Sequence, residues 1–237
     1  MIHPTSPGQP LGTMRLRCFL SLAVVCPVLL SLVPASGVAQ VPMTKPQPKS
    51  EYARIYDEDQ ADRQIDPMLF AKMSEKQLDS ATRELDRRDS IRLDRMELLL
   101  TERAPRTPDE YYFAAMILQH SRRNTLRAHE LTKSALALDS THSGARYLYA
   151  ATWDSYQISL GRPQWFGTNV DRDADGLAVV HVTDTTHVDE KTRKSYTGWT
   201  YAERVRSVAE LNERLRAERA KRQGKPPISK VPQNPQE

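Results

Sequence analysis

The middle of the chain carries helix start and stop signals, and these constrain the fold more than any other feature. Thr107 stands before Pro108, and Glu110 follows three residues after the threonine. The hydroxyl can cap free backbone N–H groups, proline suits the first helical turn, and glutamate at this position completes a capping box. We therefore expect a helix from about residue 107 to His120.

Two more helices are expected directly after it. Asn124 can cap the second, and Thr141 or Ser143 can open the third, which should end at Gly161 ahead of Pro163. The turns between the three helices are short and only reach an antiparallel neighbour. The central segment should therefore pack up, down and up.

The rest of the chain extends this helical bundle. Residues 68–103 are charged and helix-favouring, residues 176–182 favour a strand, the segment up to Trp199 looks irregular, and residues 201–222 form a final helix. Residues 128–149 resemble a tetratricopeptide hairpin, but only one partial repeat is present, whereas a stacked array needs about three. The expected class is mainly α: a bundle with tetratricopeptide-like antiparallel helices and a small irregular or β insertion after Gly161.

The N-terminus has the pattern of a secretory signal peptide. Arg15 and Arg17 precede an apolar run over 19–33 and a small-residue stretch that ends at Ala39. The alternative to a cleaved signal peptide is a retained membrane anchor. Met14, directly before the basic residues, is an alternative site for the start of translation. The predicted division is a signal peptide over 1–39, a flexible linker over 40–50, a helical domain over 51–222 and a disordered tail over 223–237. The product should be exported, to the periplasm or the extracellular space.

Cysteine usage and charge exclude several functions. Cys18 and Cys26 both lie in the predicted leader, so the mature chain lacks a thiol for a disulfide, a nucleophile or a zinc site. Loss of the leader removes two arginines and no acidic residue, which lowers the formal net charge from +4 to +2. We therefore expect no nucleic-acid partner and, after leader cleavage, no membrane span.

Two ionisable residues stand where core residues are expected. His120 ends an apolar stripe on the first central helix, and Asp154 ends one on the third. These helices run in parallel in an up-down-up bundle, so a rise of about 1.5 Å per residue puts both side chains at the same end. We expect His120 and Asp154 to pair there. The pair would be a general base with its orienting carboxylate, or a polar network that closes the bundle.

Other polar residues could converge on the same end, because the loop after Gly161 starts there. In a hydrolase-type interpretation, Asp59 or Asp62 completes a metal or acid–base set and lies near His120. The candidate binding residues are Asp59, Gln60, Arg63, Gln119, Gln164, Gly167, Thr168 and Asn169. The aromatic residues Trp153, Tyr156, Trp165 and Phe166 could cover the core end or wall a ligand pocket.

An acidic turn is a second candidate site. Asp171, Asp173 and Asp175 occupy positions 1, 3 and 5 of a calcium-loop pattern with Gly176 at position 6. Position 12 is Val182 where a bidentate glutamate is required, so an ordinary acidic turn is the alternative. Calcium is the only cofactor the sequence suggests. His181 and His187, with nearby aspartates, form a weaker metal-binding pattern.

These motifs resemble those of a bacterial domain family of unknown function. The resemblance rests on residues 59–63 (DQADR), residues 114–120 (AAMILQH), Asp154, residues 161–169 (GRPQWFGTN) and residues 175–176, and it spans about residues 51–210. The family usually has glutamine at the place of Asn169 and arginine at the place of Ser155. The resemblance implies a shared site and no particular activity.

The sequence leaves three functions open. The first is a cell-envelope binding protein for an unknown small molecule or protein, with a polar pocket around His120 and Asp154. The second is a hydrolase-type enzyme that uses a His–Asp pair, with or without metal assistance. The third is a tetratricopeptide-like scaffold for a partner peptide, which needs an apolar concave groove.

Overall fold

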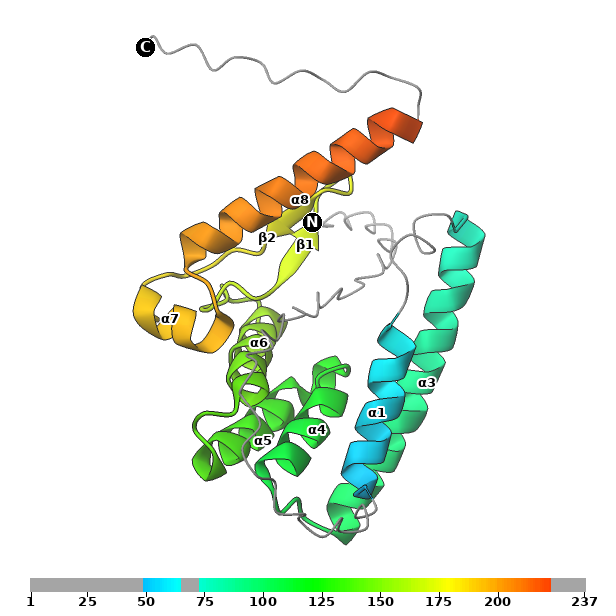
Figure 1. The fold of residues 1–237 in the computed structure, drawn as a ribbon, viewed down its shortest axis with the longest axis vertical. Coiled ribbons are helices and arrows are strands. Elements are labelled where there is room, and N and C mark those ends of the chain that lie inside the picture. Colours follow the sequence, from blue (N-terminus) through cyan, green and yellow to red (C-terminus); the bar gives the residue numbers. More distant parts are fainter. Residues whose placement is uncertain (1–48, 65–72, 223–237) are drawn as a thin grey trace, which may run out of the picture. The chain divides into compact units, whose positions relative to one another are not determined.

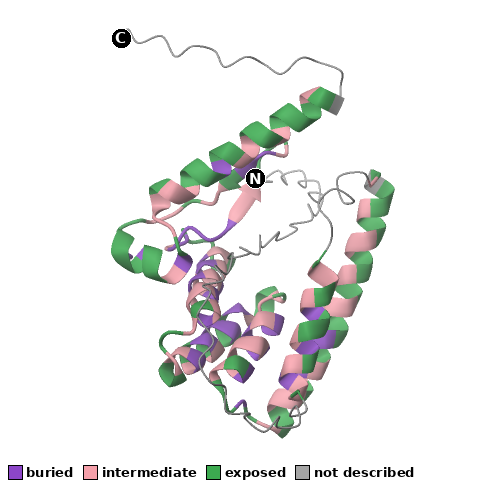
Figure 2. Ribbon diagram, in the orientation of Figure 1, coloured by how far each residue is buried: buried purple, intermediate pink, exposed green. Residues whose placement is uncertain are grey.

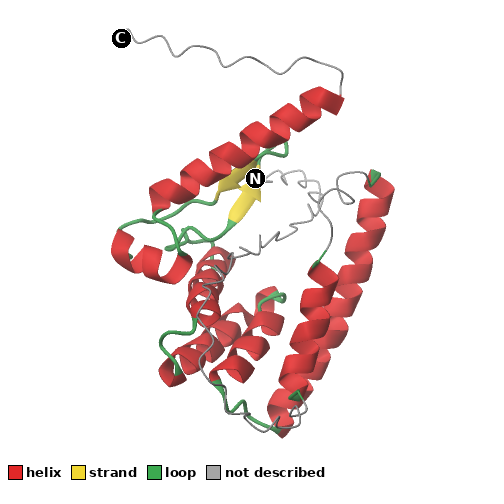
Figure 3. Ribbon diagram, in the orientation of Figure 1, coloured by secondary structure: helices red, strands yellow, loops and turns green. Residues whose placement is uncertain are grey.

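Helices make up most of the part of the chain that the computed structural model describes, residues 49–64 and 73–222 (Figures 1 and 3). The predicted leader and tail, and most of the predicted linker, lie outside these residues. The expected class, a mainly α bundle with a small β insertion, is confirmed. The elements are α1 (Glu51–Arg63), α3 (Glu75–Glu102), α4 (Pro108–Leu118), the 3-10 turn η1 (Arg122–Asn124), α5 (Thr125–Leu138), α6 (Ser143–Ser159), β1 (Val170–Arg172), β2 (Ala178–Val180), α7 (Glu190–Thr197) and α8 (Tyr201–Arg222).

The three central helices begin close to the expected positions. The Thr107 hydroxyl accepts a hydrogen bond from the Glu110 N–H at 3.2 Å, as expected for the cap. The expected capping box is not completed, because the Glu110 carboxylate accepts from Arg103 and from the Arg106 N–H instead. The cap of α6 is His142, whose Nδ1 accepts from the Ala145 N–H at 3.0 Å. Asn124 precedes α5 but its side chain makes no capping bond, because its amide donates to Glu97 of α3 at 2.9 Å.

α4 and α6 run in the same direction, with α5 packed against both. At their N-terminal ends, His142 Nε2 lies 3.0 Å from Asp109 Oδ1. At Gly144, the second residue of α6, an added Cβ would lie 3.0 Å from the Tyr112 ring, so α4 and α6 approach closely here. The predicted up-down-up order is therefore confirmed, and the C-terminal ends of α4 and α6 lie at the same end of the bundle.

α1 and α3 add a second layer to α4. α3 begins with a capping box in which Ser74 and Gln77 exchange hydrogen bonds. The side chains of Tyr52 and Ile55 from α1 and Met96 from α3 are completely buried in the core, together with apolar residues of α4, α5 and α6 (Figure 2). Apolar burial is thus what attaches α1 and α3 to the central helices.

The chain after α6 is more regular than expected. Gly161 ends α6 with a positive φ of 70°, as the stop signal predicts. The expected strand within residues 176–182 is β2, which pairs antiparallel with β1. β2 also joins α8, because the Asn212 side chain accepts from the Ala178 N–H and donates to its carbonyl. The expectation of an irregular segment up to Trp199 is wrong, since α7 forms there with Asp189 as its cap.

No helix within the described ranges is both long enough and apolar enough to cross a lipid bilayer.

The buried face of α3 gives a direct stability prediction. Met96→Ala removes a fully buried side chain and should lower the free energy of unfolding by about 2–5 kcal/mol. Leu98→Ala on the same helix is the matched control, because Leu98 is 59% exposed and should change stability by under about 0.5 kcal/mol. Urea unfolding followed by circular dichroism measures both. Equal losses in the two variants would contradict the packing described above.

Candidate functional site

His120 is paired with Asp59, a residue of α1. The Asp59 side chain is completely buried, and its Oδ1 lies 3.2 Å from His120 Nε2. The same carboxylate accepts hydrogen bonds from Gln60 and Arg63. The His120 side chain is 23% exposed, so it is partly accessible to solvent. Gln60, Arg63 and His120, all candidates from the sequence, therefore meet at Asp59.

A network of ion pairs surrounds Asp59 and joins α1 to α3. Arg92 is 5% exposed and donates to both Asp62 and Asp89, while Arg63 bridges Asp59 and Asp89. Burial on its own would lower the pKa of Arg92, but the hydrogen bonds to Asp89 and Asp62 outweigh it and raise this pKa. Asp62 accepts hydrogen bonds from Arg88 and Arg92, and these contacts give it a structural role, while its catalytic role stays a prediction.

Asp154 has partners other than His120, so the expected His120–Asp154 pair is wrong. Its Oδ1 accepts from the N–H groups of Trp165 and Phe166 at 2.7 and 2.8 Å. Its Oδ2 accepts from the N–H and the hydroxyl of Thr168 at 2.9 and 2.8 Å. Both side chains stand at the same end of the bundle, but four donors of one loop use both oxygens of Asp154. We call residues 164–169 the clamp loop.

Asp154 is a buried anion without a charged partner among these contacts. Desolvation raises the pKa of its carboxyl, and the N–H groups of Phe166, Thr168 and Trp165 and the Thr168 hydroxyl oppose that shift. Burying an ion costs several kcal/mol, whereas a hydrogen bond to a charged group contributes about 1.5–3 kcal/mol. Four such bonds return part of that cost, and burial still leaves the pKa of the Asp154 carboxyl above its usual value. The carboxylate therefore fixes the backbone of the clamp loop.

The other predicted residues of this loop brace it internally. The Gln164 side chain is buried, donates to the carbonyls of Asn169 and His181, and accepts from the Asn169 N–H. Gly167 has a positive φ of 79°, a conformation that glycine adopts readily. The structure thus brings Gln164, Gly167, Thr168 and Asn169 together with Asp154. Gln119 is not part of this group: its amide contacts the sulfur of Met116.

Two arginines that the sequence analysis missed hold the same loop through its carbonyl oxygens. Arg193 of α7 is completely buried and donates to the carbonyls of Trp165 and Val188. Arg204 of α8 donates to the carbonyls of Gly167 and Thr168 at 3.2 and 3.0 Å. Desolvation lowers the pKa of Arg204. No local sequence pattern indicated these roles, because both arginines lie in charged helical segments typical of solvent-exposed faces.

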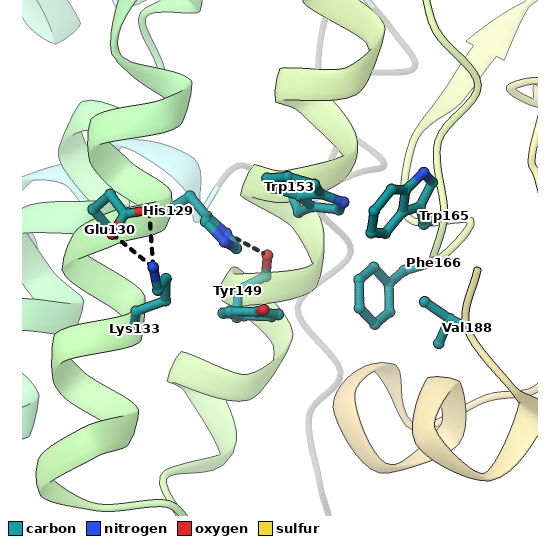
Figure 4. Close-up of a pocket in the computed structure, with 8 residues that line it drawn as sticks. All are labelled: His129, Glu130, Lys133, Tyr149, Trp153, Trp165, Phe166 and Val188. Atoms are coloured by element: carbon teal, nitrogen blue, oxygen red, sulfur yellow. Dashed lines mark hydrogen bonds and ion pairs between the residues drawn. The ribbon is translucent and has the colours of Figure 1, made fainter.

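The clamp loop forms one wall of a pocket of about 480 Å³. α5 contributes His129, Glu130 and Lys133, and α6 contributes Tyr149 and Trp153. Figure 4 shows these α6 side chains facing Trp165, Phe166 and Val188 of the opposite wall. The rings of Trp153 and Trp165 meet nearly edge to face, with centroids 5.0 Å apart. Trp153, Trp165 and Phe166 therefore line a pocket, which is one of the two roles expected for them. The pocket is a different one from that expected around His120.

His129 was not among the predicted site residues. Its Nδ1 lies 3.2 Å from the Tyr149 carbonyl oxygen and 3.3 Å from the Thr152 hydroxyl. Burial lowers the pKa of this imidazole, which therefore stays neutral at pH 7. The only sequence feature that could have indicated a role for His129 is its place beside Ala128 on the buried face of α5. A histidine at such a position is usually an ordinary core residue.

The acidic turn does not assemble a calcium site. Asp171 pairs with His181, and Asp173 accepts from the N–H groups of Asp175 and Leu177 in the turn between β1 and β2. Within the described ranges, no group of three or more acidic, histidine or cysteine side chains is placed to hold a metal ion. The prediction of Asp171, Asp173 and Asp175 as joint ligands is therefore wrong, because the backbone of a β-turn uses Asp173.

Comparisons of this chain with family models, with curated proteins and with solved structures find no match. The family resemblance of the sequence motifs stays a prediction. What the geometry adds is that these motifs form two separate clusters, one around Asp59 and His120 and one around Asp154.

The clamp loop yields a second stability prediction. Asp154→Asn replaces one acceptor oxygen by an amide that faces backbone N–H groups, so it should lower the free energy of unfolding by about 1–3 kcal/mol. Asp139→Asn is the matched control. Asp139 also accepts an N–H and a hydroxyl, but in an exposed turn, and the change there should cost under about 0.5 kcal/mol. Urea unfolding of both variants measures these changes. An unchanged free energy of unfolding in Asp154→Asn would show that Asp154 does not hold the clamp loop.

Proposed function

We propose that this chain is an exported binding protein of the cell envelope that holds a small ligand in the aromatic pocket between α5, α6 and the clamp loop. The pocket itself is the observation that carries the proposal. Binding sites for small molecules are concave, largely apolar and aromatic, and carry a few polar groups. A volume of about 480 Å³ lies in the usual range for such sites.

The construction of the clamp loop supports a binding role. Asp154 holds the N–H groups of Trp165 and Phe166, so the two side chains that line one wall have a fixed backbone. A preorganised wall loses little conformational freedom when a ligand arrives, and this favours affinity. A loop needed only to cover the core would not need to bury an ion beneath the residues that line a pocket.

The experiment uses the side-chain N–H signals of the three tryptophans in an NMR titration with indole, a neutral aromatic probe. Trp153 and Trp165 line the pocket and their signals should shift, whereas Trp199 lies outside it and should not. Trp165→Ala should weaken indole binding at least tenfold, because it removes half of the facing aromatic pair.

Trp199→Phe is the matched control and should bind indole like the wild type. Circular dichroism of each variant checks that the fold is retained, with Trp165→Phe as the milder substitution. Absence of any shift, or equal shifts at all three tryptophans, would remove the basis of the proposal.

A second candidate function is acid–base hydrolysis at His120, and the Asp59–His120 contact of 3.2 Å favours it. A buried carboxylate that orients a partly exposed imidazole is the arrangement used in general-base catalysis. In this proposal, His120 takes a proton from water as the hydroxide adds to an acyl carbon, and then returns the proton to the leaving group. Asp59 is its positioning residue.

Hydrolysis of p-nitrophenyl acetate tests this second candidate. His120→Gln should remove the rate above buffer while the melting temperature changes little. His187→Gln is the matched control, since His187 also pairs with an aspartate, Asp184, at 3.1 Å but is 46% exposed. Equal rates in the wild type and His120→Gln would assign the Asp59 cluster a structural role alone.

A further inference from the structure

The pocket has two charged lining residues, and they neutralise each other. Glu130 and Lys133 stand one turn apart on α5 and form an ion pair of 2.9 Å at the mouth. Both are about half exposed, at 56% and 51%. The remaining lining residues are aromatic or apolar, apart from the neutral His129. The pocket lining therefore combines aromatic and apolar side chains with one carboxylate and one ammonium, both on α5 (Figure 4).

This charge pattern discriminates between classes of ligand. A cationic ligand would pair with Glu130 and leave Lys133 without its partner, and an anionic ligand would do the reverse. A zwitterion can pair with both groups at once. The existing pair is easily exchanged, because an exposed ion pair of this kind contributes about 0–1 kcal/mol.

Resting on the proposed binding function, we propose that the ligand is a zwitterion of the α-amino acid type with an aromatic or bulky apolar side chain. Its ammonium group binds Glu130 and its carboxylate binds Lys133. Its side chain packs against the edge-to-face pair formed by Trp153 and Trp165. These rings present flat apolar surfaces, on which an aromatic or aliphatic group gains burial and edge-to-face contact.

The geometry of α5 supports the simultaneous pairing. Residues three apart on a helix lie on the same face, with Cβ atoms about 5–6 Å apart. The ammonium and carboxylate of an α-amino acid are attached to a single carbon, so the two groups can reach neighbouring partners of opposite charge. Figure 4 places both side chains on the α5 side of the pocket.

Isothermal titration calorimetry with three matched probes tests the inference: L-phenylalanine, 2-phenylethylamine, which lacks the carboxylate, and 3-phenylpropionate, which lacks the ammonium. Phenylalanine should bind at least tenfold more tightly than either of the other two. Glu130→Gln should weaken phenylalanine and phenylethylamine but not phenylpropionate. Lys133→Gln should weaken phenylalanine and phenylpropionate but not phenylethylamine.

Arg127→Gln, an exposed charge on the same helix and outside the pocket, is the control and should change none of these affinities. Equal affinities for the three probes would overturn the zwitterion. So would binding of indole without binding of phenylalanine, and either result leaves the proposed binding function standing. Failure of both indole and phenylalanine to bind would overturn the two proposals together.

Discussion

The buried carboxylate of Asp154 is the interaction on which the candidate binding site depends. It accepts four hydrogen bonds from the clamp loop and fixes the backbone at Trp165 and Phe166, the residues that wall the pocket. Arg193 and Arg204 donate to the carbonyls of the same loop, so its peptide groups lie between a buried anion and two arginines. This arrangement satisfies the polar groups of a loop that is largely buried, which irregular backbone requires.

The Asp59 cluster is a second buried polar centre, and it joins different elements. It links α1 to α3 through arginines and carries His120 at its edge. Removing one member of such a network leaves an unpaired buried charge, so a structural role alone explains why the charges of the cluster are paired. A structural role does not require His120 to be partly exposed to solvent. This exposure is the observation that favours an acid–base function as the alternative.

The sequence predicted the helices well because their signals are local. The caps and stops at Thr107, Pro108 and Gly161 act within one turn, and short connections determine the direction of α4, α5 and α6. The pairing of His120 was wrong because the sequence pattern placed it and Asp154 at the same end of the bundle but could not say which neighbours each side chain meets. The contributions of His129, Arg193 and Arg204 depend on contacts between distant segments, and no local pattern encodes those.

Amide hydrogen exchange measures directly whether Asp154 holds the clamp loop in place. If Asp154 holds the loop, the N–H groups of Trp165, Phe166 and Thr168 should exchange slowly, with opening free energies close to those of the buried amides of α6. The loop lies outside any helix, and its backbone hydrogen bonds to residues 181–184 are made at Gln164 and Asn169 only. Regular secondary structure would therefore not protect the N–H groups of Trp165, Phe166 and Thr168. Exchange at the rate of an unstructured peptide would show that the carboxylate does not hold the loop and that the pocket wall is not preformed.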